Sequence, residues 1–466
     1  MKKLLLSIMV FATAQFSFSQ DFQRSYGSLK YEDARTVQST DDGCFVIAGL
    51  DKGGDDAEGD AYMMKVNAAG AVLWKNYYGL ELEDGINKMI PTNDGGFLLI
   101  GHVDLNAGIC DGYIIKTDKE GTKEWSLIIG EELDDLCFDG LQTAAGDFYF
   151  TGCYENPTTQ NMDMMFSKVS AEGELIFLKA IDNGEHEIGT CIKETNDGGF
   201  LVSGWNVNDQ AEEDFHFANV DANGNTIWQK SYGTETNDRI LDLQILEDGS
   251  FLTVGGSHDG LDIEHAMVGT LSMSGGFEFS SLESSKENGY IHDITTLSNG
   301  NFVLCGQLKV DGGEDGDMFM MTIDENRQIV DKHIIPFEGD SRANAILPIS
   351  DDEFIIAGKT ALTSSNMDIL LTRLNTSNSA SITSNSHSTT ACFPNPFNDF
   401  TYLQIPTVQG EKEVQIYSLD GQLKWSEKFS ENEVFIPRND LSKGTYIYHV
   451  KGEDGSSIAN GKLTAL

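Results

Sequence analysis

The amino-acid sequence predicts an all-β protein, a seven-bladed β-propeller followed by a small β-sandwich. A segment made of a Phe, two or three apolar residues and a Gly recurs seven times, at intervals of 51 or 52 residues. A period of this length that contains several short strands is typical of a propeller blade. The Phe residues are Phe45, Phe97, Phe148, Phe200, Phe251, Phe302 and Phe354, and the Gly residues are Gly49, Gly101, Gly152, Gly204, Gly255, Gly306 and Gly358.

Each repeat predicts four strands. In the fourth copy they are the stretch around Cys191, then Phe200–Gly204, Asp214–Val220 and a last strand from Thr226. Asp-Gly and Asn-Gly turns join the first pair and the second pair, because tight hairpin turns need the positive φ that Gly and Asn adopt at low cost. Large rings recur on the fourth strand, and we expect them to pack between neighbouring blades. They are Trp74, Trp125, Phe177, Trp228 and Phe279.

The two ends of the repeat array predict how the ring closes. The seventh copy lacks a fourth strand, because its third strand runs directly into the segment 374–377. The segment Phe22–Gly27 repeats Trp228–Gly233 almost letter for letter. We therefore expect the N-terminal strand to complete the seventh blade, which removes an exposed sheet edge. The propeller would span residues 20–374.

The segments outside the propeller differ from it in composition. Residues 1–19, with Lys2, Lys3 and an apolar run, are typical of a secretory signal peptide. Of the sixteen residues 375–390, thirteen are Ser, Thr or Asn, which predicts a flexible linker. Residues 391–466 show short strands with alternating apolar residues, such as Val414 and Ile416, and predict a small antiparallel sandwich.

Four motifs in this last segment carry a resemblance to a known family. They are Phe393-Pro394-Asn395-Pro396-Phe397, the segment Val414–Gly421, the segment Leu441–Tyr446 and Gly461-Lys462-Leu463. In this order at the C-terminus they resemble the C-terminal sorting domain of the type IX (Por) secretion system of Bacteroidetes. The resemblance implies a role in sorting for Pro394, Asn395, Pro396, Gly421, Gly444, Tyr446, Gly461 and Lys462.

The same resemblance implies a route for the protein. The signal peptide would direct the chain across the inner membrane, and the sorting domain would direct it across the outer membrane through the type IX machinery. The protein would then be extracellular or on the outer cell surface, either released or tethered. The resemblance covers only this module, so the activity of the propeller stays open.

Charge and cysteine content exclude several classes of function. The chain has a formal net charge of −43, which becomes about −45 without Lys2 and Lys3. So acidic a surface disfavours nucleic acid and anionic membranes as partners. No apolar run after the signal peptide is long enough to cross a membrane, and we expect a monomer.

The seven cysteines contain no Cys-x-x-Cys pair, which disfavours zinc or redox chemistry. Cys137 and Cys191 lie on equivalent strands of adjacent blades and are a possible disulfide.

Acidic residues recur where the strands begin. We expect Asp33, Asp84, Asp135, Glu187 and Asp238 at the start of first strands. A second set stands at the start of the third strand in all seven copies: Asp60, Asp111, Asp163, Asp214, Glu264, Asp317 and Asp368. Because repetition in every blade suits a folding device, we interpret the second set as acceptors for backbone N–H groups of the preceding loop.

Two loops before third strands are richer in carboxylates and Gly than the others. Carboxylate oxygens on flexible loops are the ligands that Ca²⁺ prefers, although the spacing of an EF-hand is absent. The candidate calcium ligands are Asp55, Asp56, Asp60, Asp311, Asp315 and Asp317. A solvated acidic loop without bound metal is the favoured alternative.

No catalytic motif is present, because Gly-x-Ser-x-Gly, His-Glu-x-x-His and phosphate-binding Gly loops are missing. We therefore expect a secreted or cell-surface, non-enzymatic binding protein that recognises a glycan, a protein or a cation. The evenness of the blades favours this reading, since an enzyme needs blade-specific residues that converge on the axis. The alternative is a secreted polysaccharide hydrolase or lyase with carboxylates at the mouth of the propeller channel.

Overall fold

The computed structural model of the chain divides into two compact units, Met1–Asn378 and Ser379–Leu466. It describes residues 22–27, 31–52, 59–80, 82–105, 108–130, 133–258, 264–282, 288–309, 316–335, 337, 339–363, 366–377, 391–393, 400–404, 410, 412–418, 422–430, 433–438, 441–452 and 457–465. The signal peptide and most of the linker therefore lie outside the described residues.

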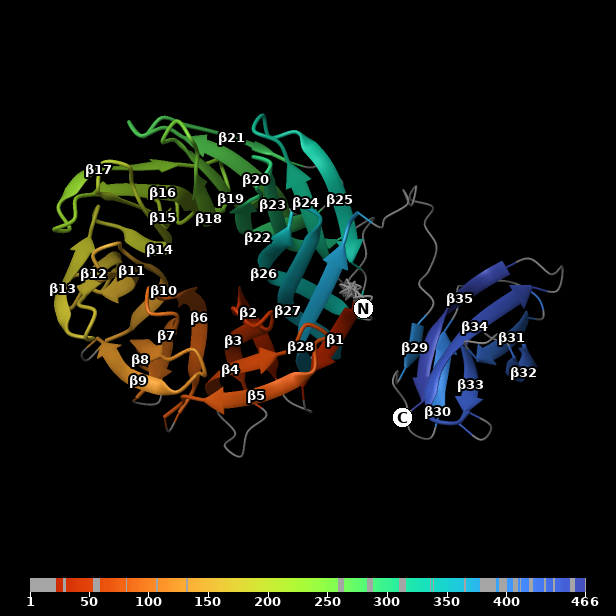
Figure 1. Cartoon of the computed structure of the whole chain (residues 1–466). Helices are drawn as coiled ribbons and strands as arrows, with labels where there is room; N and C mark the ends of the chain where they lie inside the picture. The colour runs from red at the N-terminus through yellow and green to blue at the C-terminus, as the bar shows by residue number, and fades with distance from the viewer. Residues whose placement is uncertain are drawn as a thin grey trace, which may run out of the picture. The chain divides into compact units, whose positions relative to one another are not determined.

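Seven four-stranded antiparallel sheets form the first unit, one for each sequence repeat. In Figure 1 they surround a common axis, with β2, β6, β10, β14, β18, β22 and β26 nearest to it. These seven are called the inner strands below. The blades are blade 1, β2 (Glu32–Ser39), β3 (Phe45–Asp51), β4 (Asp60–Val66) and β5 (Val72–Tyr77); blade 2, β6 (Asp84–Pro91), β7 (Phe97–Asp104), β8 (Cys110–Thr117) and β9 (Lys123–Ile129); blade 3, β10 (Asp135–Gln142), β11 (Phe148–Glu155), β12 (Met162–Val169) and β13 (Leu175–Ile181); blade 4, β14 (His186–Glu194), β15 (Phe200–Val207), β16 (Glu213–Val220) and β17 (Thr226–Tyr232); blade 5, β18 (Asp238–Ile245), β19 (Phe251–His258), β20 (Glu264–Leu271) and β21 (Phe277–Ser281); blade 6, β22 (Asn288–Thr296), β23 (Phe302–Lys309), β24 (Asp317–Ile323) and β25 (Ile329–Ile335); and blade 7, β26 (Asp340–Ser350), β27 (Glu353–Thr363) and β28 (Asn366–Asn375).

The N-terminal strand β1 (Phe22–Tyr26) completes blade 7. It pairs antiparallel with β28, with Phe22 opposite Arg373 and Tyr26 opposite Ile369. The rings of Phe22 and Tyr26 pack against the buried core shared by blades 7 and 1, and the Tyr26 hydroxyl donates to the Gly70 carbonyl at 2.6 Å. One strand from the start of the domain therefore closes the ring beside the last repeat.

The apolar core lies between neighbouring blades. One cluster, for example, joins Val46 and Met63 of blade 1 to Phe97 and Ile115 of blade 2, with Trp74 packed against it. The other rings of the fourth strands occupy the same kind of place, which confirms their predicted role in packing. Each blade is thus held mainly by apolar contact with its two neighbours.

A β-bulge in every inner strand explains the repeated Gly. The register shifts at the same place in all seven, for instance between Gly189 and Cys191 in β14. A Cβ atom on the facing Gly204 would lie 1.9 Å from the Ile188 carbonyl oxygen, and the other six closing Gly residues show 1.8 to 2.2 Å. Only Gly permits so close an approach of two backbones.

The second unit contains two small sheets that share one core. The three-stranded sheet has the order β29 (Ala391–Phe393), β30 (Phe400–Gln404), β33 (Glu433–Pro437); the four-stranded sheet has the order β32 (Leu423–Phe429), β31 (Lys412–Ser418), β34 (Gly444–Gly452), β35 (Ser457–Ala465). Val414, Ile416, Tyr446 and Tyr448 of the larger sheet pack against Leu403 of the smaller. This is the predicted sandwich, with β29 as an additional strand.

The possible disulfide is wrong. Cys137 and Cys191 are both buried free thiols. The Cys191 thiol instead donates to Asp242 Oδ1 at 3.1 Å. Cys137 precedes the bulge of β10 whereas Cys191 follows the bulge of β14, so the two thiols do not occupy equivalent positions.

Candidate functional site

The acidic residues that begin the inner strands hold nearby backbone. Asp135 Oδ1 accepts from the Glu155 amide at 3.1 Å, and Glu187 Oε1 accepts from the Glu185 amide at 3.2 Å. Asp238 Oδ2 accepts from the amide of Thr234 at 2.5 Å. Asp135, Glu187 and Asp238 are at most 3% exposed. Their positions are therefore explained by the scaffold, as capped loop ends.

Asp33 does not occupy the position that the sequence suggests. In blade 1 the equivalent residue is Glu32, because Glu32 pairs with Asp51 at the far end of its hairpin as Asp84 pairs with Val103. Asp33 lies one residue further along the inner strand. Two adjacent acidic residues caused the error, because only Glu32 stands thirteen residues before its blade Phe, as Asp84 does before Phe97.

The third-strand set needs a similar correction. In blade 5 the equivalent of Asp60 is His265 and not Glu264, since it lies two residues before the partner of the closing Gly, as Asp60 does. The carboxylate is therefore present in six blades instead of seven. In two of these blades the predicted contact with the preceding loop is made to a side chain, because Asn156 and Asn208 donate to Asp163 and Asp214.

Carboxylates of adjacent blades lie close together at four boundaries of the described part of the ring. A Cβ atom on Gly130 would lie within 3 Å of side-chain oxygens of both Asp111 and Asp135, which shows how near the two are. Burial raises the pKa of Glu187 to about 8, and the neighbouring charges of Asp163 and Asp182 add to that rise. The four pairs are Asp60 with Asp84, Asp111 with Asp135, Asp163 with Glu187, and Asp214 with Asp238.

One of these boundaries brings together three carboxylates. Oxygen atoms of Asp163, Asp182 and Glu187 all lie within 4.8 Å of one another, which is compatible with a single hard cation. Of the predicted calcium ligands, Asp60 and Asp317 begin β4 and β24. Asp55, Asp56, Asp311 and Asp315 lie outside the described residues, so calcium binding by those loops stays a prediction.

Five charged residues of the inner strands meet at the axis of the ring. This axial cluster consists of Lys88, Asp139, Lys193, Asp242 and Asp293, from blades 2 to 6. Lys88 Nζ lies 3.7 Å from Asp293 Oδ1, although blades 2 and 6 are not neighbours, so this ion pair crosses the axis. Lys193 Nζ lies 3.6 Å from Asp242 Oδ1.

The axial carboxylates also bond each blade to the next. Asp139 Oδ2 accepts from the Ile192 amide at 3.0 Å, and Asp293 Oδ2 accepts from the Ile346 amide at 2.8 Å. Asp242 Oδ2 accepts from the Ile294 amide at 3.3 Å. Each of these Asp residues comes directly after the bulge of its own inner strand. In the following blade it bonds to the amide of the second residue after the bulge.

The axial carboxylates differ in proton affinity. Burial raises the pKa of Asp293 to about 7; the charge of Asp242 adds to this rise, and Lys88 opposes it. Burial also acts to raise the pKa of Asp242, but Lys193 and Lys88 outweigh it and hold the pKa below its usual range. Asp242 and Asp293 share a hydrogen bond between their carboxyl groups. The pair therefore holds one proton at mildly acidic pH and loses it as the pH rises through about 7.

A second group of charged residues lies where blades 7 and 1 meet. Arg35 on β2, Arg342 on β26 and Lys359 on β27 form this basic cluster, and all three side chains are half-buried. Lys359 Nζ donates to the Tyr31 hydroxyl at 2.9 Å, and that hydroxyl donates to Asp33 Oδ2 at 3.1 Å. Arg35 Nε donates to the same Asp33 oxygen at 3.2 Å. Asp33 is thus the one carboxylate in direct contact with the cluster among the described residues.

Amide side chains orient the two guanidinium groups. Arg35 Nη1 donates to Asn87 Oδ1 at 2.6 Å, and Arg342 Nε donates to Asn344 Oδ1 at 2.8 Å. Asn344 in turn donates to the Ala34 carbonyl of the next blade at 2.7 Å. In Figure 1 the strands that carry the cluster, β2, β26 and β27, adjoin one another at the closure of the ring.

The basic cluster is poor in counter-charge. Burial lowers the pKa of Lys359 to about 8, and the charge of Arg342 adds to this effect. Within the described ranges, no carboxylate oxygen lies within 4.0 Å of a charged nitrogen of Arg342 or Lys359. Burial, with Arg342 and Lys359, holds the pKa of His292 well below its ordinary value. Positive charge therefore accumulates here in a strongly acidic chain.

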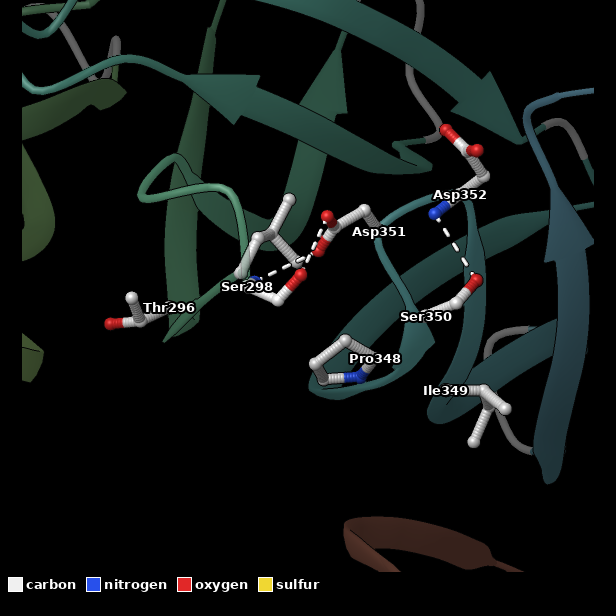
Figure 2. Close-up of a pocket in the computed structure, with 8 residues that line it drawn as sticks. Thr296, Ser298, Pro348, Ile349, Ser350, Asp351 and Asp352 are labelled. Carbon is white, nitrogen blue, oxygen red and sulfur yellow. Dashed lines mark hydrogen bonds between the residues drawn. The ribbon is translucent and has the colours of Figure 1, made fainter.

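A pocket of about 570 Å³ lies at the other end of the inner strands, between the first hairpins of blades 6 and 7. Figure 2 shows Ser298 and Asp351 facing each other across it, where the Ser298 amide and hydroxyl donate to Asp351 at 2.8 and 2.7 Å. These bonds join two blades, so the carboxylate of Asp351 is already used. The lining residues are Thr296, Leu297, Ser298, Pro348, Ile349, Ser350, Asp351 and Asp352.

Sequence reasoning identified the repeated carboxylates and missed both clusters. A signal for the axial cluster was available, because four of its members stand nine residues before a blade Phe: Lys88, Asp139, Asp242 and Asp293. Arg35 and Arg342 stand ten and twelve residues before Phe45 and Phe354. Aligning the repeats on Phe would have shown that these positions carry charge in some blades, whereas the positions eleven and eight residues before Phe stay small or apolar.

Comparison with known proteins identifies the second unit. Residues 391–461 match the family model of the secretion system C-terminal sorting domain. Of the sorting residues, Gly444 and Tyr446 lie on β34, and Gly461 and Lys462 on β35. Pro394, Asn395, Pro396 and Gly421 lie outside the described residues. No curated protein matches the chain.

The fold is similar to several solved structures. A Dyadobacter fermentans protein of unknown function shares 13% identity, with 76% of this chain and 99% of that one covered and a TM-score of 0.45. The WD40 domain of Neurospora crassa Pan2 shares 10% identity, with 79% and 99% covered and a TM-score of 0.49. A variant of puromycin hydrolase shares 10% identity, with 90% and 59% covered and a TM-score of 0.50. Of these three, only the puromycin hydrolase variant reaches a TM-score of 0.50, and at 10% identity it bears on the fold alone.

The fold and the family match together establish the type of protein and its export route. Its seven four-stranded sheets are the blades of a propeller. The described residues contain no apolar helix long enough to span a bilayer. The sorting domain implies interaction with the secretion machinery and export through the outer membrane, to the cell surface or the extracellular space. The protein is a β-propeller that carries a C-terminal sorting domain of the type IX secretion system.

Proposed function

We propose that the protein is a secreted or cell-surface binding protein without enzymatic activity, and that its ligand contacts the end of the ring where the inner strands begin. The observation that carries this proposal is the basic cluster, whose cations Arg342 and Lys359 have no carboxylate partner among the described residues. Asp33, the carboxylate in direct contact with the cluster, is itself engaged by the Leu50 amide at 3.1 Å. We therefore assign the side chains of Arg342 and Lys359 to the recognition of an external partner.

Variation between blades supports a ligand site near the axis. The bulge residue of each inner strand has the same place in every blade but a different side chain. These residues are Arg35, Asn87, Phe138, Thr190, Leu241, His292 and Asn344. The blades are therefore even in their scaffold but not at the inner rim, and such a rim suits recognition of one asymmetric ligand as well as it suits the converging residues of an enzyme.

The alternative function, a polysaccharide hydrolase or lyase, draws support from the different pKa values of Asp242 and Asp293, since such a split suits an acid and a base. Geometry opposes it. The two carboxyl groups are hydrogen-bonded to each other, whereas glycosidases hold theirs about 5 to 9.5 Å apart to accommodate the sugar. Both groups also accept backbone amides of the next blade.

One experiment separates the two functions. The mature chain, residues 20–466, is run in affinity electrophoresis through gels that contain neutral, carboxylated or sulfated polysaccharides, and the same polymers are assayed for new reducing or unsaturated ends. We expect retardation in at least one gel and no new ends. New ends that disappear in Asp242→Asn would establish the enzymatic alternative, and retardation in none of the gels would remove glycans as ligands.

A further inference from the structure

We propose that the basic cluster of Arg35, Arg342 and Lys359 binds a compact oxyanion, namely the carboxylate or sulfate group of an acidic saccharide. The inference rests on the proposed binding function and adds the chemistry of the ligand. It assigns a site that the repeated acidic residues of the sequence would not suggest.

The charge balance is the first support. The whole chain has 31 Lys and Arg residues against 74 Asp and Glu residues, yet Arg342 and Lys359 are half-buried without a carboxylate partner among the described residues. Half-buried cations lose hydration, and they are costly unless a counter-charge restores the loss. The lowered pKa of Lys359 reports this cost. A bound anion would supply the missing counter-charge to Arg342 and Lys359 together.

The hydrogen-bond donors are the second support. Arg342 uses Nε for Asn344, and within the described residues no acceptor contacts its two terminal nitrogens. Lys359 spends one of its three N–H groups on Tyr31. Arg35 spends Nε and Nη1 on Asp33 and Asn87. Guanidinium groups present paired donors that match the two oxygens of a carboxylate or sulfate.

The scaffold holds these donors in place before a ligand arrives. Tyr31 fixes Lys359 both by the hydrogen bond and by the position of Nζ 5.1 Å from the centre of its ring. Asn344 is fixed in turn by the Ala34 carbonyl of the next blade. Preorganised donors lower the entropic cost of binding. The cluster thus has the character of a built site instead of a set of free surface side chains.

The surroundings select the size of the anion. A polyanion such as nucleic acid carries one negative charge per about 1.7 Å, and the acidic surface would repel all of it except the part at the cluster. A saccharide with one anionic group on a neutral ring meets the cations without this penalty. Its hydroxyl groups can bond to polar neighbours, of which Asn87 and His292 lie at the same level of the ring.

Calorimetric titration of the mature chain tests the proposal. The probes are sodium glucuronate, glucose 6-sulfate and, as the neutral match, glucose, all at the same ionic strength. We expect heat of binding for one or both anionic sugars and none for glucose, and the comparison of the two anions distinguishes carboxylate from sulfate. Arg342→Gln should weaken binding at least about tenfold, because it removes charge-assisted hydrogen bonds.

Matched variants keep the test decisive. Lys123→Gln removes the same charge at an exposed position on β9 and should bind as the unaltered chain does. If Arg342→Gln is unfolded at the temperature of the assay, Lys359→Gln is used in its place. Equal responses to glucose and to both anions, or equal weakening by Lys123→Gln and the cluster variants, would overturn the proposal.

The outcome also separates this inference from the proposed function. If the chain is retarded by a neutral polysaccharide but gives no response to either anion, binding stands and the anion assignment fails. If the chain releases new polysaccharide ends, the proposed function fails while the anion site can still be measured in Asp242→Asn.

Discussion

Replacing Asp293 by Asn should make the propeller more stable at alkaline pH than the unaltered protein. Asp293 accepts the Ile346 amide and shares a hydrogen bond with Asp242. Its pKa is raised from 3.8 to about 7, chiefly by burial. The group is therefore protonated in the fold at pH values where it is ionised in the unfolded chain. Asn has the shape and the donor of that protonated form.

The sign follows from proton linkage. Between about pH 4 and pH 7 the native state holds one proton more than the unfolded state, so the free energy of unfolding falls as pH rises. One pH unit corresponds to about 1.36 kcal/mol, which gives a total cost of about 4 kcal/mol before screening. Because the side chain is 13% exposed, we expect about 2 to 4 kcal/mol. Roughly half of it develops above pH 5.5.

Thermal unfolding from pH 5.5 to 8.5 provides the assay, since so acidic a chain approaches zero net charge at lower pH. The Tm of Asp293→Asn should exceed that of the unaltered protein by an amount that grows by several degrees across this range. Asp209→Asn removes an exposed charge on blade 4 and should give a constant difference. Parallel curves for Asp293→Asn and the unaltered protein would refute the buried, protonated state of Asp293.

Three further predictions concern the scaffold. Deletion of residues 21–28 should lower Tm by more than about 5 °C, because it exposes the edge of β28; an unchanged melting curve would contradict closure by β1. Gly204→Ala should cost about 3 kcal/mol or more in chemical denaturation, because its Cβ would meet the Ile188 carbonyl at 1.9 Å; a cost near zero would show that the bulge relaxes. Lys359→Met should raise the free energy of unfolding at pH 7, because the fold lowers the lysine pKa from 10.5 to about 8. This gain should vanish above about pH 10.5, where the lysine is neutral in both states. A gain that is independent of pH would point to packing instead.

The sequence predicts the sheets well because each blade repeats the same local rules. Turn residues with positive φ and a fixed Phe locate the second, third and fourth strands, and the repeated segment Phe22–Gly27 identifies the closing strand. The inner strands are harder, because their bulges interrupt the alternation of buried and exposed residues. Asp33 was misplaced because its neighbour Glu32 is also acidic, and the variable loop before the third strand misplaced Glu264.

The candidate site could be predicted only in part. Repetition reveals the carboxylates that serve every blade, but it conceals residues that matter because they differ. Lys88 and Asp293 meet only across the completed ring, and Arg35 and Lys359 only through its closure. These contacts depend on the relative positions of whole blades in the completed ring, and no local sequence pattern encodes those positions.

Closure by β1 has a consequence for the time course of folding. The partners Phe22 and Arg373 are joined by almost the whole domain, so the last sheet cannot form until its final strand has been synthesised. Contacts between such distant segments form slowly. Until then β28 and the inner faces of blades 1 and 7 remain open, and the basic cluster, built from those same blades, does not yet exist. The chain therefore gains its proposed recognition site in its last folding step, so that binding competence reports a completed ring.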